Sequence, residues 1–149
     1  MIELLQNSDA EIAEKIRAVF QSSYKVEAAI LGVEDFPPLR RPVEHFIENS
    51  NQFFGCFQNG TLAGVIEIEE HNDFVDINSL VVDPRFFRQG IAKRLLQFAL
   101  DQFDTQYFIV ETGLENEPAT NLYKQFGFQE VEQWDTDFGV RKVKFELWL

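Results

Sequence analysis

The chain has 149 residues, the length of a single domain, and 45% of them are hydrophobic, which is enough to bury an independent core. Its formal net charge of -12 argues against nonspecific binding to nucleic acid and favours cationic small molecules or basic peptides as partners. The first five residues lack the cationic start of a signal peptide, and no apolar run approaches the roughly 18 residues of a membrane span. We therefore expect a cytoplasmic protein with one domain over residues 1–149.

The first part of the chain alternates helix and strand patterns with turn residues. Residues 1–5 are typical of a short strand, and Ser8-Asp9 provides a cap for a helix that is expected to end near Tyr24. Residues 25–41 contain Pro37-Pro38 and are expected to form a loop beside the substrate, and Pro42 can open a second helix over residues 42–48. Strands are expected over residues 51–58 and 62–69, because Asn59-Gly60 is a strong hairpin signal.

The second part of the chain predicts a parallel crossover followed by antiparallel strands. Expected elements are a strand over 74–82, a helix over 88–103, a strand over 107–111, a helix over 118–126, and strands over 128–134 and 140–149. A strand, a helix and a second strand in succession indicate a right-handed parallel connection. The mixture predicts an α/β protein with a central mixed sheet and helices on both faces.

The turn that follows the 74–82 strand has the composition of an anion site. Arg85, Arg88, Lys93 and Arg94 concentrate positive charge in an otherwise acidic chain. The first turn of a helix has backbone N–H groups without internal partners and carries partial positive charge, so it can bind a phosphate or diphosphate. Gly90 lets such a ligand approach the backbone closely.

Two segments together resemble a known family. The first reads Phe87-Arg88-Gln89-Gly90-Ile91-Ala92, and the second, residues 110–128, contains Asn116, Ala119, Leu122 and Tyr123 at its characteristic spacing. Both are similar to motifs of the GNAT superfamily of acyl-CoA N-acyltransferases, and the resemblance covers residues 74–128. Phe87 departs from the polar residue that the family has at this position, which affects a side-chain contact but leaves backbone contacts in place.

The resemblance implies a fold, a cosubstrate and a set of binding residues. It implies a mostly antiparallel sheet of about seven strands in which the strands holding Leu80 and Val110 splay apart and admit the pantetheine arm of acetyl-CoA. Transfer would proceed by direct attack in a ternary complex, without an acyl-enzyme, and many members of the family dimerise, so a homodimer is compatible with it. The implied acetyl-CoA-binding residues are Leu80, Val81, Val82, Phe87, Arg88, Gln89, Gly90, Ile91, Ala92, Lys93, Asn116 and Tyr123.

Acetyl transfer to an amine requires a proton acceptor and a proton donor. An alkyl amine of pKa near 10.4 is neutral in roughly one molecule in two thousand at pH 7, so a carboxylate or a water must take its proton. Asp76 corresponds in position to the base of some relatives, Glu67 and Glu69 are rivals, and each is equally explained as a solvated strand residue. The resemblance assigns Tyr123 as the acid that protonates the leaving thiolate; an apolar helical stripe explains it as a packed residue.

Other conspicuous residues receive structural interpretations. Cys56 has no partner for a disulfide and is expected to be packed in a strand, and His45 and His71 are expected at the surface. Without a Cys/His cluster, no metal is expected. The Arg40-Arg41 pair can assist a phosphate or a substrate carboxylate, or be solvated. The resemblance implies that Trp134, Asp135, Asp137 and Phe138 border the acceptor pocket, although an ordinary turn explains the residues there equally well.

The sequence leaves a second class of function open. An acyl-CoA-binding sensor or regulatory domain would keep the cofactor site and lack turnover. A phosphate-loop nucleotidase is disfavoured because the Gly-Lys-Ser/Thr element is absent. The preferred interpretation is an N-acetyltransferase that uses acetyl-CoA and acts on a cationic amine of a small molecule or peptide, with no nucleic-acid or membrane partner.

Overall fold

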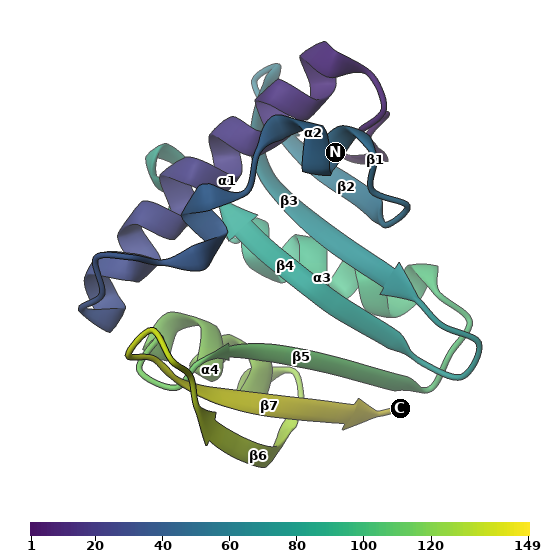
Figure 1. Cartoon of the computed structure of the whole chain (residues 1–149). Helices are drawn as coiled ribbons and strands as arrows, with labels where there is room; N and C mark the ends of the chain where they lie inside the picture. Colours follow the sequence, from purple (N-terminus) through teal and green to yellow (C-terminus); the bar gives the residue numbers. More distant parts are fainter.

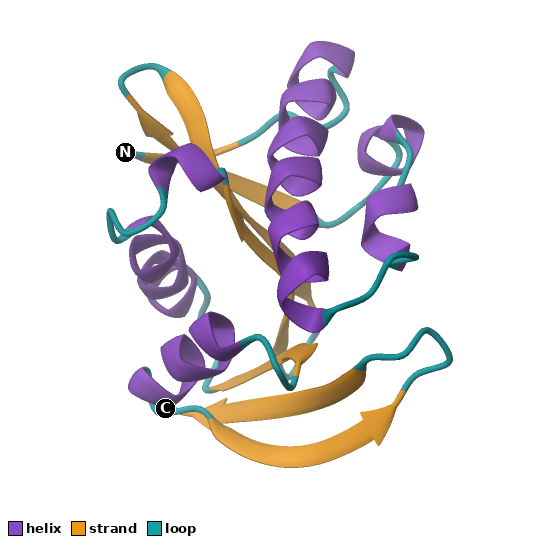
Figure 2. Cartoon of the chain, turned by 90° about the vertical axis from the view of Figure 1, so that its left-hand side faces the viewer, coloured by secondary structure: helices purple, strands orange, loops and turns teal.

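The computed structural model describes all 149 residues as one seven-stranded sheet of order β1-β2-β3-β4-β5-β7-β6 with helices on both faces (Figures 1 and 2). The strands are β1 (Ile2–Leu4), β2 (Gln52–Gln58), β3 (Thr61–Glu70), β4 (Val75–Val82), β5 (Tyr107–Gly113), β6 (Gln129–Asp135) and β7 (Arg141–Trp148). The helices are α1 (Ala10–Leu31), α2 (Val43–Ile47), α3 (Ile91–Gln102) and α4 (Glu117–Gln125), with short 3-10 turns η1 (Pro37–Arg40) and η2 (Pro84–Phe86). Every strand pair is antiparallel except β4 with β5. The predicted mixed, mostly antiparallel sheet is confirmed.

Two apolar clusters hold the helices against opposite faces of the sheet. α3 and α4 cover one face, where Leu95 and Tyr123 pack into the larger cluster. α1 and α2 cover the other, where Phe20 and Phe46 meet with their ring centroids 4.9 Å apart. The sheet is therefore buried on both sides, and a path from one face to the other exists only where strands separate.

Such a separation occurs between β4 and β5. The two strands are paired only over residues 75–77 and 108–110, and beyond these residues they diverge (Figure 1). A bulge accompanies the divergence, since Glu67 lies opposite Ser79 while Ile68 lies opposite Ile77, which leaves Asn78 as an extra residue in β4. A bulge bends its strand and increases its twist. The predicted splay of the parallel pair is confirmed.

The first helix is longer than its pattern predicted. Asp9 caps α1, as expected, by accepting hydrogen bonds from the backbone N–H groups of Glu11 and Ile12 at 2.9 and 3.3 Å. The helix continues past Tyr24 because residues 25–31 contain no helix breaker, and it ends where Gly32 adopts a left-handed conformation with φ 70°. The prediction of a loop over residues 25–31 was therefore wrong. Residues 25–31 belong to a helix, and their side chains are held on a rigid element.

The segment that connects α1 to β2 folds back along α1. The side chains of Arg17 and Gln21 donate hydrogen bonds to the backbone carbonyls of Arg41 and Leu39, at 3.0 and 2.9 Å. The second helix is confirmed, although it covers only Val43–Ile47. No helix in the structure combines the length and apolar character that crossing a lipid bilayer requires.

Candidate active site

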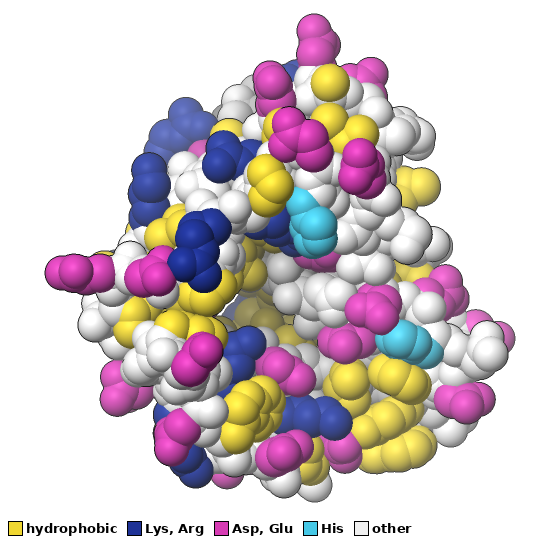
Figure 3. All heavy atoms as spheres, in the orientation of Figure 1, with side chains coloured by type: hydrophobic (Ala, Val, Ile, Leu, Met, Phe, Trp, Pro, Cys, Tyr) yellow, Lys and Arg dark blue, Asp and Glu magenta, His cyan; other side chains and the backbone are white.

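Two cavities meet at the gap between β4 and β5. The larger, of about 770 Å³, lies between α1, the η1 segment and the strands β3, β4 and β5. The smaller, of about 460 Å³, lies between α1, β4, the start of α3 and α4. Figure 3 shows the face of the molecule hollowed near the centre of the view, with apolar side chains in its depth. Both cavities are lined by Glu27, Leu80, Asn116, Ala119 and Tyr123, which makes these residues the junction.

The start of α3 forms one end of the smaller cavity. The helix begins at Ile91, three residues later than predicted, because Arg88 and Gly90 both have positive φ angles, of 64° and 74°, and form a turn. No side chain caps this helix, so its first N–H groups are free to bind a ligand. A Cβ atom placed on Gly90 would meet nothing within 4 Å, so the backbone faces open space. This turn fits an anion, because the free N–H groups at the start of a helix can bind a phosphate or diphosphate.

The remaining residues predicted to bind acetyl-CoA divide between this cavity and other surroundings. Besides the junction residues, seven of the predicted residues line this cavity: Val82, Phe87, Arg88, Gly90, Ile91, Ala92 and Lys93. Val81 is buried in the cluster on the α1 face, and Gln89 lies outside the cavity, where it accepts a hydrogen bond from Gln58 at 3.3 Å. Arg85 pairs with Asp83 at 2.8 Å and lines a separate groove. Positive charge at the smaller cavity therefore comes from Arg88 and Lys93.

Tyr123 presents a buried hydroxyl at the junction. Only 4% of the residue is exposed, and its ring packs against Phe128 and Phe145 with centroid distances of 5.6 and 5.9 Å, so it does belong to an apolar stripe. Its hydroxyl makes no hydrogen bond to the protein, yet it is not occluded. Burial, reinforced by Tyr24 and Glu27, raises the pKa of Tyr123 above its ordinary value. The group stays protonated near neutral pH and can donate a hydrogen bond or a proton.

Glu27 lies at the same junction and was missed by sequence reasoning. Its Oε1 accepts a hydrogen bond of 2.8 Å from Nδ2 of Asn116, which precedes α4. Burial raises the pKa of Glu27 to about 7, while Lys142 and the Asn116 hydrogen bond act in the opposite direction. A signal did exist: once α1 is extended to Leu31, a carboxylate interrupts the apolar face formed by Phe20, Tyr24 and Leu31.

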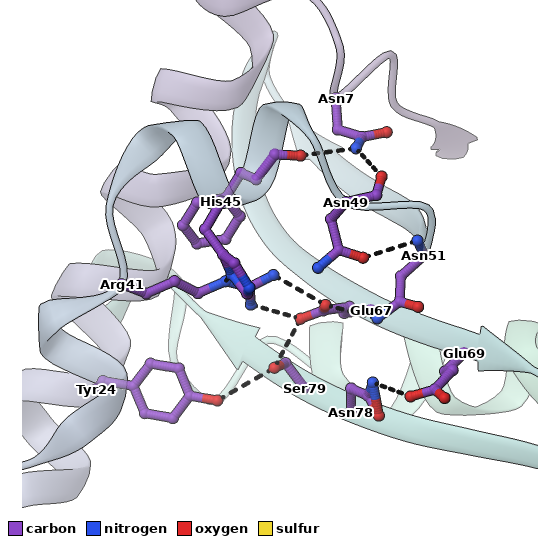
Figure 4. A network of polar contacts seen from close by, with 11 residues as sticks. Asn7, Tyr24, Arg41, His45, Asn49, Asn51, Glu67, Glu69, Asn78 and Ser79 are labelled. Atoms are coloured by element: carbon purple, nitrogen blue, oxygen red, sulfur yellow. Dashed lines mark hydrogen bonds and ion pairs between the residues drawn. The ribbon is translucent and has the colours of Figure 1, made fainter.

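A buried ion pair forms the wall of the larger cavity (Figure 4). Glu67 is 3% exposed and accepts hydrogen bonds from both terminal nitrogens of Arg41, at 2.8 and 3.0 Å. Asn51 and Ser79 donate two further bonds to the same carboxylate, at 2.9 and 3.1 Å. The Arg41 guanidinium lies 4.0 Å from the centroid of the Phe46 ring. Arg41 is thus neither solvated nor free to bind a phosphate, and both Glu67 oxygens are occupied.

The two other predicted carboxylates lie further along β3 and β4. Glu69 lines the larger cavity and accepts a hydrogen bond of 2.9 Å from Asn78, whereas Asp76 lines neither cavity. Burial, together with the neighbouring Glu69 and Glu111, raises the pKa of Asp76 to about 6.

His71, Cys56 and Phe138 take different positions relative to the cavities. His71 lies 2.9 Å from Glu69, and these two with Asp76 bring one potential ligand atom each within 4.8 Å of one another, an arrangement that the sequence did not indicate. Cys56 is fully buried and lines neither cavity. Phe138, from the last loop, borders the larger cavity.

Known proteins resemble this chain in sequence. Residues 13–128 match the sequence profile described as the Acetyltransferase (GNAT) family. The chain is 38% identical over 149 residues to the UPF0157 protein YqkA of Bacillus subtilis, which covers 99% of this chain and 43% of that protein. It is 30% identical over 120 residues to the N-alpha-acetyltransferase RimI of Mycobacterium tuberculosis, which covers 77% of this chain and 75% of RimI. The chain thus spans less than half the length of the first relative and most of the second.

Solved structures share the fold at low sequence identity. The ribosomal-protein-S18-alanine N-acetyltransferase of Escherichia coli superposes with a TM-score of 0.78 at 20% identity, over 99% of this chain and 92% of that one. The PaiA N-acetyltransferase of Thermoplasma acidophilum, in complex with coenzyme A, gives a TM-score of 0.71 at 20% identity, over 97% and 98%. Both likenesses extend over nearly the whole sheet and its helices.

Proposed function

The chain belongs to the GNAT acetyltransferase family, and on that premise we propose that it transfers an acetyl group from acetyl-CoA to the primary amine of a small molecule or peptide. One observation carries the proposal. Two cavities meet where β4 and β5 diverge, and the unpaired hydroxyl of Tyr123 lies at their junction. One cavity suits the acetyl donor and the other suits the acceptor.

The acetyl donor fits the smaller cavity. The free N–H groups at the start of α3 suit its diphosphate, and Arg88 and Lys93 add positive charge. The apolar side chains of Leu80 and Val82 line the route from this turn to the gap, as an acyl-pantetheine arm requires. The coenzyme A in the PaiA structure supports an acyl-CoA as the donor.

Direct attack of the amine on the thioester suits the groups present. The amine nitrogen forms a bond to the carbonyl carbon, and collapse of the tetrahedral intermediate breaks the carbon–sulfur bond. Tyr123 donates its proton to the departing thiolate, a role for which a hydroxyl kept protonated by burial is suited. The buried position of Cys56, outside both cavities, supports transfer without an acyl-enzyme.

The larger cavity favours a cationic acceptor. Glu27, Glu69 and Glu111 line it, while the charge of Arg41 is compensated by Glu67. Lys142 is the remaining basic lysine or arginine of the lining, and it lies 3.9 Å from Glu111. A protonated amine is therefore attracted into the cavity before it loses a proton.

A screen of amines with acetyl-CoA, in which release of free thiol is measured, tests the proposal. Polyamines, amino acids, aminoglycosides and peptides with free N-termini sample the acceptor classes. We expect turnover with at least one class and a loss of about 10²-fold or more in kcat for Tyr123→Phe, the scale of general acid catalysis, with unchanged coenzyme A binding by calorimetry. Tyr107→Phe, on a tyrosine that instead bonds Glu146 and stacks on Trp148, is the matched control.

Two results would contradict the proposal. Unchanged turnover in Tyr123→Phe would reject the acid role of the hydroxyl. Tight binding of coenzyme A without thiol release for any amine would favour the acyl-CoA-binding sensor over the enzyme.

A further inference from the structure

We propose that Glu27 is the catalytic base of this reaction, its carboxylate taking the proton of the acceptor amine at the junction of the two cavities. The inference rests on the proposed function and adds to it the residue that makes the amine nucleophilic. It replaces Asp76, Glu67 and Glu69, the strand carboxylates that the sequence favoured.

Position distinguishes Glu27 from every other carboxylate. It is the one acidic residue that lines both cavities, and it does so together with Tyr123, the proposed acid. Glu67 and Glu69 line the larger cavity only, and Asp76 lines neither. The amine must attack where the thioester emerges from the gap, so its base has to lie at the junction and not along the outer wall.

Hydrogen bonding leaves Glu27 able to accept a proton. Asn116 binds Oε1 at 2.8 Å and fixes the direction of the side chain, while Oε2 has no protein donor. Glu67 differs, because Arg41, Asn51 and Ser79 occupy both of its oxygens. A carboxylate held on one oxygen and open on the other is oriented without being saturated.

The proton affinity of Glu27 is suited to the task. Burial raises the pKa of its carboxyl to about 7, so near neutral pH a large fraction is ionised and ready to accept a proton. A base whose pKa lies near the working pH combines availability with driving force. A carboxylate of ordinary pKa would be a much weaker base toward an ammonium ion.

The proton balance assigns one step to each residue. The ammonium ion of the acceptor gives one proton to Glu27, which later releases it to solvent. The neutral nitrogen then attacks the carbonyl carbon, and the carbon–nitrogen bond forms. As the carbon–sulfur bond breaks, the thiolate takes the hydroxyl proton of Tyr123, and the second proton of the nitrogen restores that hydroxyl. The products are the N-acetyl amine, coenzyme A thiol and one proton.

Glu27→Gln tests the assignment, because glutamine keeps the size of the side chain and the carbonyl oxygen that Asn116 binds. With acetyl-CoA and the best acceptor of the amine screen, we expect kcat/KM at pH 7.5 to fall by about 10²-fold. Coenzyme A binding by calorimetry should change less than twofold. The rise of kcat/KM with pH up to about 7 in the wild type should disappear. Glu14→Gln, an exposed glutamate on the same helix, is the matched control and should leave both rate and profile unchanged.

A second readout separates chemistry from packing. If Glu27 removes the proton, the defect of Glu27→Gln should shrink with a less basic amine related to the best acceptor, because more of that amine is already neutral. A residue that only shapes the cavity would give the same defect with both amines. Glu27→Asp keeps a carboxylate, so it should retain part of the activity, and its rise of kcat/KM with pH should remain but occur at a different pH. This variant replaces Glu27→Gln in the test if the glutamine variant does not fold.

The possible outcomes distinguish a failure of the proposed function from a failure of the Glu27 assignment. Absence of thiol release by the wild type with every amine would overturn the proposed function and this assignment with it. Wild-type turnover with an unchanged rate and pH profile in Glu27→Gln would overturn Glu27 alone. The same follows if the pH limb persists in Glu27→Gln and is lost in Glu69→Gln or Asp76→Asn.

Discussion

The smaller cavity takes the wall that is proposed to face the diphosphate from one stretch of chain, residues 80–93. The larger cavity takes its polar groups from α1, the segment between α1 and β2, and the strands β3, β4, β5 and β7. The first depends on backbone N–H groups, whose geometry survives most changes of side chain. The second depends on side chains that satisfy one another across long sequence distances, such as Arg41 with Glu67. Substitutions that change only a side chain should therefore be tolerated at the first cavity and costly at the second, whereas Gly90, whose backbone conformation shapes the turn, is sensitive to substitution.

The largest expected effect is at the ion pair of the larger cavity. Glu67→Gln removes the charge that compensates Arg41, whose side chain is only 15% exposed. Asn51 and Ser79 also donate hydrogen bonds to the Glu67 carboxylate. Removing one partner of a buried ion pair leaves an uncompensated charge and costs about 3–5 kcal/mol. Urea unfolding of the variant and the wild type measures this loss.

An exposed ion pair provides the control for that measurement. Asp135 pairs with Arg141 at 2.9 Å, with side-chain exposures of 79% and 45%. Asp135→Asn should cost no more than about 1 kcal/mol, as surface ion pairs do. Equal losses in the two variants would show that burial does not distinguish the larger cavity.

The same contrast explains what the sequence could predict. The turn before α3 combines Gly90, Arg88 and Lys93 within a few residues, and these local signals predict an anion site there. The splay of the strand pair, in contrast, was implied only by the resemblance to the GNAT family. The proposed base, Glu27, could not be predicted in this way. Glu27 reaches Asn116 across 89 residues of sequence, a distance that no local pattern reports.

The end of α1 shows where the local argument failed. Residues 25–31 contain good helix formers, and Gly32 was the stop signal, but the prolines at 37 and 38 drew the boundary back to Tyr24. Glu67 illustrates a second limit. Its place on a strand was predictable, whereas its pairing with Arg41 depends on how the η1 segment folds back over the sheet.

Glu27 should also make the free energy of unfolding depend on pH. Its pKa of about 7 in the folded chain lies above its ordinary value of 4.5, so its contribution to the free energy of unfolding is full below pH 4.5 and is lost as pH rises through 7. Glu27→Gln removes that loss and should be more stable than the wild type by about 3 kcal/mol at pH 8.5, since each pKa unit corresponds to about 1.4 kcal/mol. At pH 4.5 the two should be equal.

Urea unfolding at both pH values measures this difference, with Glu14→Gln as the exposed control. A gain at high pH combined with a loss of turnover is expected of a group kept for function at the expense of stability. A stability difference that does not vary with pH would argue that Glu27 has an ordinary pKa in the folded chain.

A smaller effect on stability is expected at the turn of the smaller cavity. Gly90→Ala places a Cβ on a residue with φ 74°, which costs about 1–2 kcal/mol, partly offset by the lower entropy of the unfolded chain. Because that Cβ enters the space where the diphosphate is proposed to lie, coenzyme A affinity should fall at least about tenfold, or 1.4 kcal/mol. Gly60→Ala has a similar φ of 79° and equally open surroundings in the β2–β3 hairpin, so it should cost similar stability and leave the affinity unchanged.

The smallest effect is expected where the sequence departs from the family pattern. Phe87 lines the smaller cavity and is 43% exposed, so Phe87→Gln, which introduces a polar residue there, should change the free energy of unfolding by no more than about 0.5 kcal/mol. If backbone N–H groups at the start of α3 carry the phosphate contacts, the dissociation constant for coenzyme A should change less than about threefold, or 0.7 kcal/mol. Leu4→Gln, on an equally exposed apolar residue of β1, controls for the loss of surface hydrophobicity. A tenfold change in affinity at Phe87 alone would mean that this cavity, like its neighbour, depends on a particular side chain, and the contrast between the two cavities would no longer hold.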